Sequence, residues 1–205
     1  MASNRRGARD RIVLASASPR RRELLAQMGY AFDVVPANVD ETVRAGADPA
    51  REAERLAAAK AGEVAARTPP AVVIGADTLV ALGVEIIGKP RDRAHAAEML
   101  RRLSGTAHRV ITGVCVVDNR RGAAVAETDA VSTAITMRPM SEDEIRAYVE
   151  SGEADGKSGA YAIQETADRY VLKAEGSFTN VVGLPTERLG EMLAALGLRP
   201  AGAAG

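Results

Sequence analysis

Cysteine and histidine are scarce in the sequence, and their scarcity excludes two common kinds of site. The 205 residues include one cysteine and two histidines. One cysteine cannot form an internal disulfide or a cysteine cluster around a metal, and two scattered histidines do not make a zinc site. Cys115 lies in the apolar run VITGVCVV, so we expect a buried strand residue there rather than a reactive thiol. We expect His95 on a helix surface and His108 at the start of a strand, and neither as a catalyst.

Net charge and long hydrophobic runs are also absent. Lysine plus arginine and aspartate plus glutamate number 27 each, so no overall field draws the chain toward nucleic acid or a membrane. No apolar segment approaches the roughly 20 residues that span a bilayer. The first ten residues lead directly into a strand pattern rather than into the apolar core of a signal peptide. We therefore expect a cytoplasmic protein with no nucleic-acid partner and no membrane association.

Strand and helix patterns alternate along the chain. A strand is predicted over 11–16, followed by a helix that Ser18 and Pro19 begin and Gly29 ends. The further expected elements are an apolar strand run over 30–39, an alanine-rich helix over 48–67, strands on both sides of a Leu82-Gly83 turn over 71–88, a helix over 92–105, a hairpin over 108–138 with its turn at 118–122, a helix over 141–152 that Ser141 and Glu144 cap, a glycine-punctuated approach to a strand over 156–164, and a last helix over 186–196.

These elements predict one mixed α/β domain over residues 11–196, either a single lobe or two lobes with a cleft between them. Residues 1–10 and 197–205 are expected as flexible tails.

The stretch LASASPRRRELLAQMG, residues 14–29, has the character of an anion site. A helix that begins at Ser18 and Pro19 presents free backbone N–H groups, and Arg20 to Arg22 add cations whose planar forks suit phosphate. The sequence has neither a GxxxxGK[ST] loop nor a GxGxxG motif after its first strand, so two common phosphate-binding loops are excluded. A solvated basic helix face explains the same residues equally well.

Asp77 interrupts the apolar strand pattern VVIGADTLV, where a buried carboxylate is costly without a compensating partner. A structural turn at Thr78 is one explanation, and a strand-end metal ligand or general base is the favoured one. Lys89 is near enough along the chain to share a site with Asp77. By composition alone, Glu41, just past a strand, and Lys60, on the alanine-rich helix, resemble ordinary surface residues.

The segment GKSGAYAIQ has its own candidate ligand contacts. It could bring Lys157, Tyr161 and Gln164 to a ligand, and the paired donor and acceptor of Gln164 suit the reading of a base.

Seven motifs occur together in one order along the chain, and together they closely resemble the Maf family of nucleoside triphosphate pyrophosphatases. They are LASASPRRRELL, Asp40-Glu41, GADT at 75–78, GKP at 88–90, LSG at 103–105, GKSGAYAIQ at 156–164 and NVVGLP at 180–185. The resemblance implies an elongated α/β fold, a mixed twisted sheet flanked by helices with a central cleft, related to inosine triphosphate pyrophosphatases. It also implies hydrolysis of a nucleoside triphosphate to the monophosphate and pyrophosphate, and it favours a homodimer.

The resemblance assigns the catalytic roles to four residues. Asp77 matches the family's general base, which activates water for attack at the α-phosphorus. Glu41 matches a carboxylate that, with Asp77, holds a divalent ion, Mg²⁺ or Mn²⁺. Lys60 and Lys89 match lysines that face phosphate or water.

The resemblance also assigns the substrate contacts. Ser16, Arg20 and Arg21 fall on the phosphate-binding motif. The combination of Arg21, Thr78 and Gln164 looks like the branch that acts on dTTP and UTP, where the amide of Gln164 would pair with a pyrimidine edge.

The sequence departs from that branch at three places. Residues 165–169, Glu-Thr-Ala-Asp-Arg, replace a glycine-rich turn, Ala162 stands where glycine is common, and Phe178 where tyrosine is common. These changes would reshape the base pocket without touching Asp77. The expected activity is hydrolysis of dTTP, UTP and modified pyrimidine nucleotides, a cleansing of the nucleotide pool that is linked to arrest of cell division. The same chemistry on another base such as 7-methyl-GTP, or a nucleotide-binding division regulator with little turnover, are the alternatives.

Overall fold

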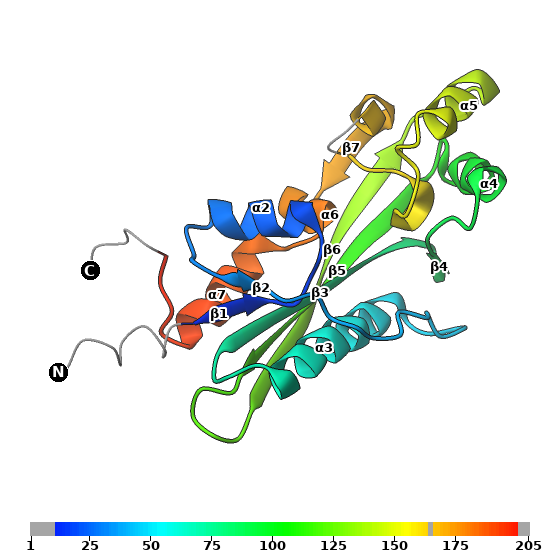
Figure 1. Cartoon of the computed structure of the whole chain (residues 1–205). Helices are drawn as coiled ribbons and strands as arrows, with labels where there is room; N and C mark the ends of the chain where they lie inside the picture. Colours follow the sequence, from blue (N-terminus) through cyan, green and yellow to red (C-terminus); the bar gives the residue numbers. More distant parts are fainter. Residues whose placement is uncertain (1–10, 164–165, 201–205) are drawn as a thin grey trace.

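The apolar runs of the sequence form the central strands of one mixed sheet. The computed structural model describes residues 11–163 and 166–200, and seven strands of this described chain are ordered β2-β1-β3-β5-β6-β7, with β4 paired to β3 (Figure 1). The strands are β1 Ile12–Leu14, β2 Asp33–Val34, β3 Val72–Leu82, β4 Glu85–Ile87, β5 Ala107–Asp118, β6 Val125–Met137 and β7 Val171–Glu175. β1 pairs parallel with β2 and β3, and the remaining pairs are antiparallel. The predicted mixed α/β fold is confirmed.

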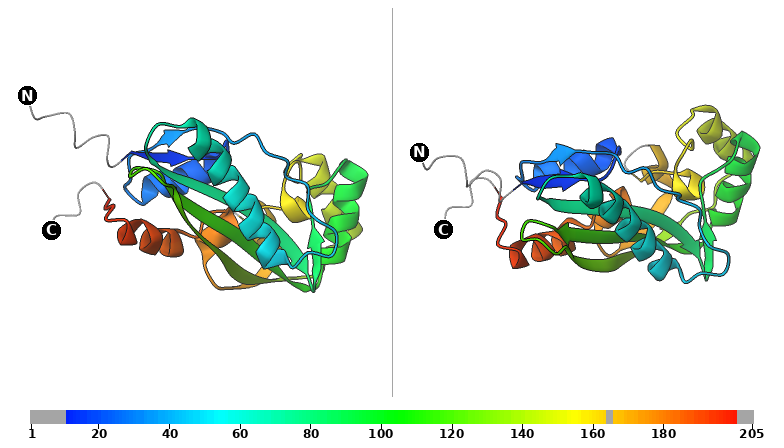
Figure 2. Two further views of the ribbon diagram at one scale, coloured as in Figure 1. Left: turned by 90° about the horizontal axis from the view of Figure 1, so that it is seen from below. Right: turned by 60° about the horizontal axis from the view of Figure 1, so that its bottom comes forward.

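Helices cover both faces of the sheet, as the views in Figures 1 and 2 show. They are α2 Pro19–Gln27, α3 Pro49–Arg67, α4 Arg93–Leu103, α5 Glu142–Glu150, α6 Phe178–Val182 and α7 Thr186–Ala195, with 3-10 turns η1 Ser158–Ala160 and η2 Thr166–Tyr170. Side-chain caps at Ser18, Asp48, Asp92 and Ser141 start four of them, and Ser141 and Glu144 form the predicted capping box. None of the helices in the described chain is both long and apolar enough to cross a membrane.

Side chains of β3 alternate between two cores on opposite faces of the sheet. Val73 packs with α3, while Val72 and Ile74 pack with α2 and α7. The same alternation directs Asp77 toward α3 and Thr78 toward α2. Neighbouring residues of one strand thus serve opposite sides of the sheet.

Two strand glycines let α3 lie directly on the sheet. A β-carbon at Gly75 would fall 2.3 Å from the carbonyl oxygen of Ala57, and one at Gly113 would fall 2.2 Å from that of Ala53. Both alanines belong to the buried face of α3. The close approach of helix and strand brings Lys60, on the same helix, over β3.

A further hydrophobic core lies at the other end of the molecule. There α4, α5 and the two 3-10 turns pack against the ends of β3, β5 and β6, around buried residues such as Leu100, Ile135, Tyr148 and Tyr170. Figure 2 shows these helices at the end of the elongated molecule opposite to α7. Because β3 and β5 contribute residues to this core and to the two cores described above, the described chain forms two lobes on one sheet.

Several local boundaries differ from the prediction. The hairpin between β3 and β4 turns at Gly83-Val84 rather than at Leu82-Gly83, since Gly83 takes a φ of +62°. The segment 156–164 does not lead into a strand: residues 158–160 form η1 and the next strand begins at Val171. β2 contains two residues only, so Glu41 lies within an irregular segment and not just past a strand.

One residue near the end of the described chain, Leu198, belongs to the core. Leu198 falls in the segment expected as a flexible tail from residue 197, yet it is 4% exposed and packs in the core beneath α7. Its N–H donates to the carbonyl of Leu193. Apolar burial thus extends past the predicted end of the domain.

Candidate active site

The site lies where β3 changes its neighbour. β1 pairs with β3 only as far as Ile74, and β4 begins to pair at Val80. Among the described strands, none pairs with residues 75–79 on this edge of β3. Asp77 and Thr78 occupy this gap, in the middle of a long strand rather than at the predicted strand end. The carboxyl end of β1 and the start of α2 border it, which is where α/β sheets commonly bind ligands.

A pocket of about 310 Å³ opens at the gap, between the two lobes. Its lining includes eight of the nine predicted site residues: Ser16, Arg20, Arg21, Glu41, Lys60, Asp77, Thr78 and Lys89. The ninth, Gln164, lies outside the described residues, so its role in reading the base stays a prediction. Lys157 and Tyr161, which the sequence also indicated, line the same pocket.

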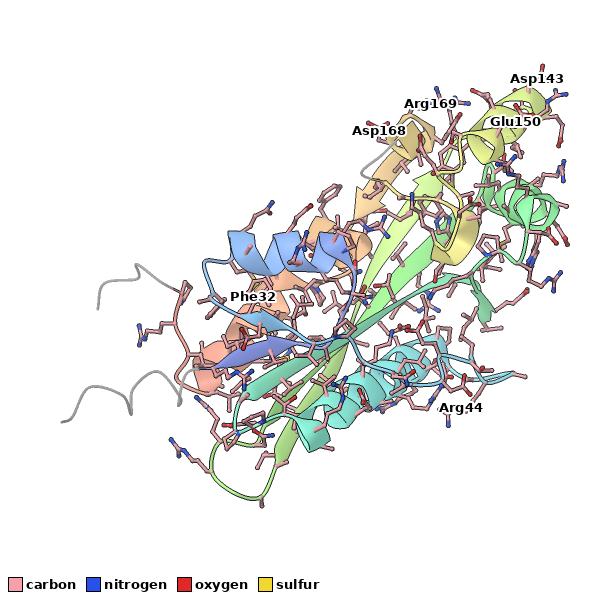
Figure 3. All side chains as sticks on the ribbon, in the orientation of Figure 1. Phe32, Arg44, Asp143, Glu150, Asp168 and Arg169 are labelled. Atoms are coloured by element: carbon pink, nitrogen blue, oxygen red, sulfur yellow. The ribbon has the colours of Figure 1, made fainter. Side chains whose placement is uncertain are left out.

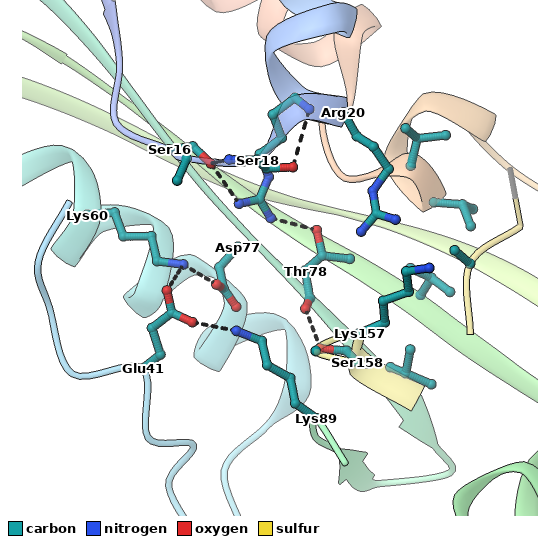
Figure 4. Close-up of a pocket in the computed structure, with 18 of the residues that line it drawn as sticks. Ser16, Ser18, Arg20, Glu41, Lys60, Asp77, Thr78, Lys89, Lys157 and Ser158 are labelled. Atoms are coloured by element: carbon teal, nitrogen blue, oxygen red, sulfur yellow. Dashed lines mark hydrogen bonds and ion pairs between the residues drawn. The ribbon is translucent and has the colours of Figure 1, made fainter. Parts of the chain in front are cut away.

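Two carboxylates and two lysines alternate on one side of the pocket (Figure 4). Lys60 Nζ lies 2.5 Å from Asp77 Oδ1 and 2.7 Å from Glu41 Oε1, and Lys89 Nζ lies 2.8 Å from Glu41 Oε2. Partial burial acts to raise the pKa of Glu41, but the hydrogen bonds from Lys60 and Lys89 outweigh it and lower that pKa to about 2. Glu41 is therefore ionised throughout the neutral range.

Lys60 is buried, although residue type alone suggested that it lies at the surface. It is 6% exposed and its ammonium joins the carboxylates of Glu41 and Asp77. A helical pattern could have revealed this, because position 60 falls on the apolar stripe of α3 that includes Leu56 and Val64. Burial of a lysine on that stripe requires a charge partner from the sheet, and Asp77 provides it.

The start of α2 forms the other border of the pocket. Figure 4 shows the Arg20 guanidinium directed into the pocket, near Lys157. Arg22 is exposed and is not part of the lining, so the predicted cluster of three arginines reduces to two. Arg20 together with the N–H groups at the start of α2 suits a phosphate.

Arg21, on α2, links three other parts of the chain around the pocket. Its Nε donates to the carbonyl of Gly183 at 2.8 Å, Nη1 to Ser16 Oγ at 3.4 Å and Nη2 to Thr78 Oγ1 at 3.0 Å. Burial lowers the pKa of its guanidinium, whereas the negative charges of Asp77 and Glu41 raise it. The group stays charged at neutral pH. Arg21 therefore holds the β1–α2 loop, β3 and the end of α6 together.

Thr78 lies within strand β3, so the structural turn that was one explanation of the sequence at this position does not form. Its hydroxyl also lies 2.9 Å from that of Thr112, and its carbonyl accepts a hydrogen bond from Ser158. Of the departures noted in the sequence, Ala162 lines the pocket, whereas Phe178 is 52% exposed and does not. The change at Phe178 therefore leaves the pocket wall unchanged.

Comparison with known proteins shows the family of this chain. The family of Maf-like proteins matches residues 11–196. The chain belongs to the Maf-like family. Proteins named dTTP/UTP pyrophosphatase are 48% identical in Pelotomaculum thermopropionicum, over 91% of this chain and 96% of that one, and 49% identical in Geobacter sulfurreducens, over 91% and 97%. A third, from an Anaeromyxobacter species, is 51% identical over 89% of this chain and 88% of its own.

A solved structure shares the fold. The Ham1 protein of Staphylococcus aureus matches 91% of this Maf-like chain and 100% of its own, with a TM-score of 0.51 and 15% sequence identity. At that identity the likeness concerns the arrangement of strands and helices, and the chemistry rests on the pocket residues.

Proposed function

We propose that this Maf-like protein hydrolyses dTTP and UTP to the nucleoside monophosphate and pyrophosphate. The observation that carries the proposal is the contact between buried Lys60 and Asp77 in a pocket that arginines border on its other side. Relatives that align over about nine tenths of this chain are named dTTP/UTP pyrophosphatases, which supports these two substrates over 7-methyl-GTP. A protein that only bound nucleotides would need the cations without a carboxylate placed as a base.

Asp77 is the base in this proposal. Lys60 donates to Asp77 Oδ1 and orients the carboxylate, which leaves Oδ2 to accept a proton from water. The water oxygen then forms a bond to the α-phosphorus while the bond to the bridging oxygen breaks. Pyrophosphate leaves with that oxygen, and the monophosphate keeps the oxygen of water.

Cations around the pocket balance the charge of the triphosphate. The Arg20 guanidinium lies on one side of Thr78, and Lys60 and Lys89 lie on the other (Figure 4). Fixed positive charges that face a phosphoryl group stabilise the transition state, because negative charge grows on the leaving oxygen.

The carboxylates of Glu41 and Asp77 fit a divalent ion. They converge on one ammonium, and oxygen ligands of this kind suit Mg²⁺ or Mn²⁺. Among the described residues, no three histidine, cysteine or acidic side chains are placed to hold an ion by themselves, so we propose that phosphate oxygens and water supply the remaining ligands. When bound, such an ion would withdraw charge from the phosphate oxygens.

We further propose that modified pyrimidine nucleotides are substrates and that the enzyme works in the cytoplasm, as a cleanser of the nucleotide pool. A homodimer and a link to cell-division arrest stay predictions.

A panel of nucleoside triphosphates tests the proposal. Purified protein is incubated with each nucleotide and Mg²⁺ or Mn²⁺, and monophosphate and pyrophosphate are measured beside an Asp77→Asn variant and a sample with EDTA. We expect selective turnover of dTTP and UTP that both the substitution and EDTA abolish. A preference for purines would contradict the substrate assignment, and turnover that persists in Asp77→Asn would contradict the role of the base.

A further inference from the structure

A buried histidine lies behind the pocket wall and makes no contact with the proposed reacting groups. His108, on β5, is 2% exposed, and its Nε2 lies 2.6 Å from the hydroxyl of Tyr161. The two rings meet edge to face, with centroids 5.5 Å apart. Tyr161 lines the pocket, whereas His108 does not. The sequence indicated nothing for His108 beyond a place at the start of a strand.

Both members of this pair are neutral. Burial lowers the pKa of His108 to about 4 and raises that of Tyr161, so imidazole and phenol are uncharged at neutral pH. The other ring nitrogen of His108, Nδ1, has no protein partner within the described residues. Two apolar side chains would fill the same space without leaving a buried nitrogen unpaired. Packing alone therefore does not explain this polar pair.

Tyr161 ends a turn that forms one wall of the pocket. Two hydrogen bonds hold the start of the turn: Ser158 Oγ donates to the carbonyl of Thr78, and Gly159 N donates to that of Gly88. Gly159 and Ala160 both have left-handed backbone conformations, with φ of +72° and +59°. The bond to His108 holds the end of the turn to β5, just before Ala162 and Ile163, which also line the pocket.

Apolar residues of the core around Tyr161 also line the pocket, in contrast to the side that contains Asp77: Val80, Val110, Ile163 and Val181. With Tyr161 they form the apolar wall, and Lys157 and Ser158 at the start of the same turn are the polar residues beside it. The charged groups of the pocket suit the triphosphate, so the apolar wall suits the base and sugar. The Tyr161 ring belongs to the part of the pocket that meets the nucleoside.

We propose that His108 is a positioning residue, which acts through the Tyr161 hydroxyl to hold the apolar wall against the nucleoside part of the substrate. The inference rests on the proposed function, because it assumes that a nucleotide occupies the pocket. His108 does not touch the reacting phosphate, so its loss weakens substrate binding more than it slows the chemical step.

The test combines His108→Phe, Tyr161→Phe and the double variant. For dTTP and UTP we expect each single substitution to raise KM about three- to tenfold, the effect of one lost hydrogen bond, with kcat changed less than about twofold. The double variant should match the single ones, because both remove the same bond. His108→Gln, which keeps a donor and an acceptor, should restore most of the wild-type KM.

Tyr170→Phe is the matched control. Tyr170 is a buried tyrosine of the same core, and its hydroxyl has no protein partner within the described residues. Removal of that hydroxyl should leave KM unchanged. Additive effects of the two single substitutions, or lower melting temperatures with an unchanged KM, would show that the pair only supports packing.

Binding of dTMP, measured by calorimetry, separates this inference from the proposed function. If the wild type binds dTMP but hydrolyses no nucleotide, the proposed function fails, and weaker dTMP binding by His108→Phe still supports the positioning role. Equal dTMP binding by wild type and His108→Phe overturns that role. A wild type that neither binds dTMP nor turns over any nucleotide overturns both proposals.

Discussion

Replacing Glu52 by glutamine tests how the protein holds Glu41 in place. Glu52 lies in the first turn of α3 with no exposed side-chain surface. Its carboxylate accepts hydrogen bonds from the backbone and side chain of Arg44 at 2.9 Å each, and from Arg55 at 2.7 and 3.0 Å. Arg55 also donates to the carbonyl of Thr42. The ion cluster thus fastens the segment just after Glu41 to the helix that carries Lys60; Figure 3 labels Arg44 at the outer end of that segment.

The size of the effect follows from the pKa of Glu52. Hydrogen bonds from Arg55, and to a smaller extent those from Arg44, lower this pKa from 4.5 to about 2. Burial acts in the opposite direction but is outweighed. A difference of about 2.5 pH units corresponds to roughly 3.4 kcal/mol. Side chains of Arg44 and Arg55 are 61% and 32% exposed, and solvent screening of these partners reduces the figure. We therefore expect Glu52→Gln to lower the free energy of unfolding by about 2–3 kcal/mol and the melting temperature by roughly 5–10 °C.

Urea unfolding and turnover of dTTP are the assays, with Glu54→Gln as control. Glu54 lies on the same helix and pairs only with the exposed Arg51 among the residues described, so its loss should change stability by less than about 0.5 kcal/mol. Glu52→Gln should also lower turnover several-fold at temperatures where it is folded, because Glu41 is held less firmly. Unchanged stability and turnover in Glu52→Gln would refute the role of the cluster.

The lowered pKa of Glu52 also predicts how the stability difference between wild type and Glu52→Gln depends on pH. The folded-state pKa of Glu52 lies below the unfolded value, so its contribution to stability is present above pH 4.5 and is lost as the pH falls toward about 2. Wild type and Glu52→Gln should therefore differ most near pH 7, and the difference should narrow below pH 4.5. A difference that stays constant down to about pH 3 would contradict this assignment.

Two further substitutions test the placement of α3. Lys60→Met keeps most of the unbranched apolar stem of the side chain but removes the ammonium between Glu41 and Asp77, so we expect turnover to fall by about a hundredfold or more. Lys173→Met, on the exposed β7, should leave turnover unchanged. Gly75→Ala forces a β-carbon against the carbonyl of Ala57 and should destabilise the fold by about 3 kcal/mol in urea unfolding. Its control is Gly62→Ala, where an added β-carbon would meet no atom within 4 Å beyond the neighbouring backbone of its own helix. This substitution should raise the free energy of unfolding by about 0.5–1 kcal/mol. Wild-type stability in Gly75→Ala, or wild-type turnover in Lys60→Met, would show that α3 does not set the geometry of the site.

Local patterns predicted most of the helices and strands. The family resemblance, and not local patterns, predicted the eight described residues that line the pocket. Caps at Ser18 and Asp48 and the apolar stripe of α3 are local features, so the sequence displays them directly. The burial of Lys60 depends on Gly75 and Gly113, which lie on strands far from it along the chain. The apolar stripe of α3 indicates that Lys60 is buried, but no single segment of the sequence reveals its contact with Asp77.

Contacts between distant segments explain the other differences. Tyr161 meets His108 across 53 positions, and Arg21 meets Gly183 across 162. The sequence indicated Arg21 and Tyr161 as ligand contacts, but their protein partners emerge only when the sheet brings distant segments together. β7 and α6 were not predicted because their apolar stretches are short.

Hydrolysis of dTTP in water enriched in ¹⁸O tests the central claim most directly. If water activated by Asp77 attacks the α-phosphorus, one ¹⁸O atom appears in dTMP and none in pyrophosphate, and Asp77→Asn forms almost no labelled product. Label in the pyrophosphate, or release of dTDP and phosphate, would contradict attack at the α-phosphorus.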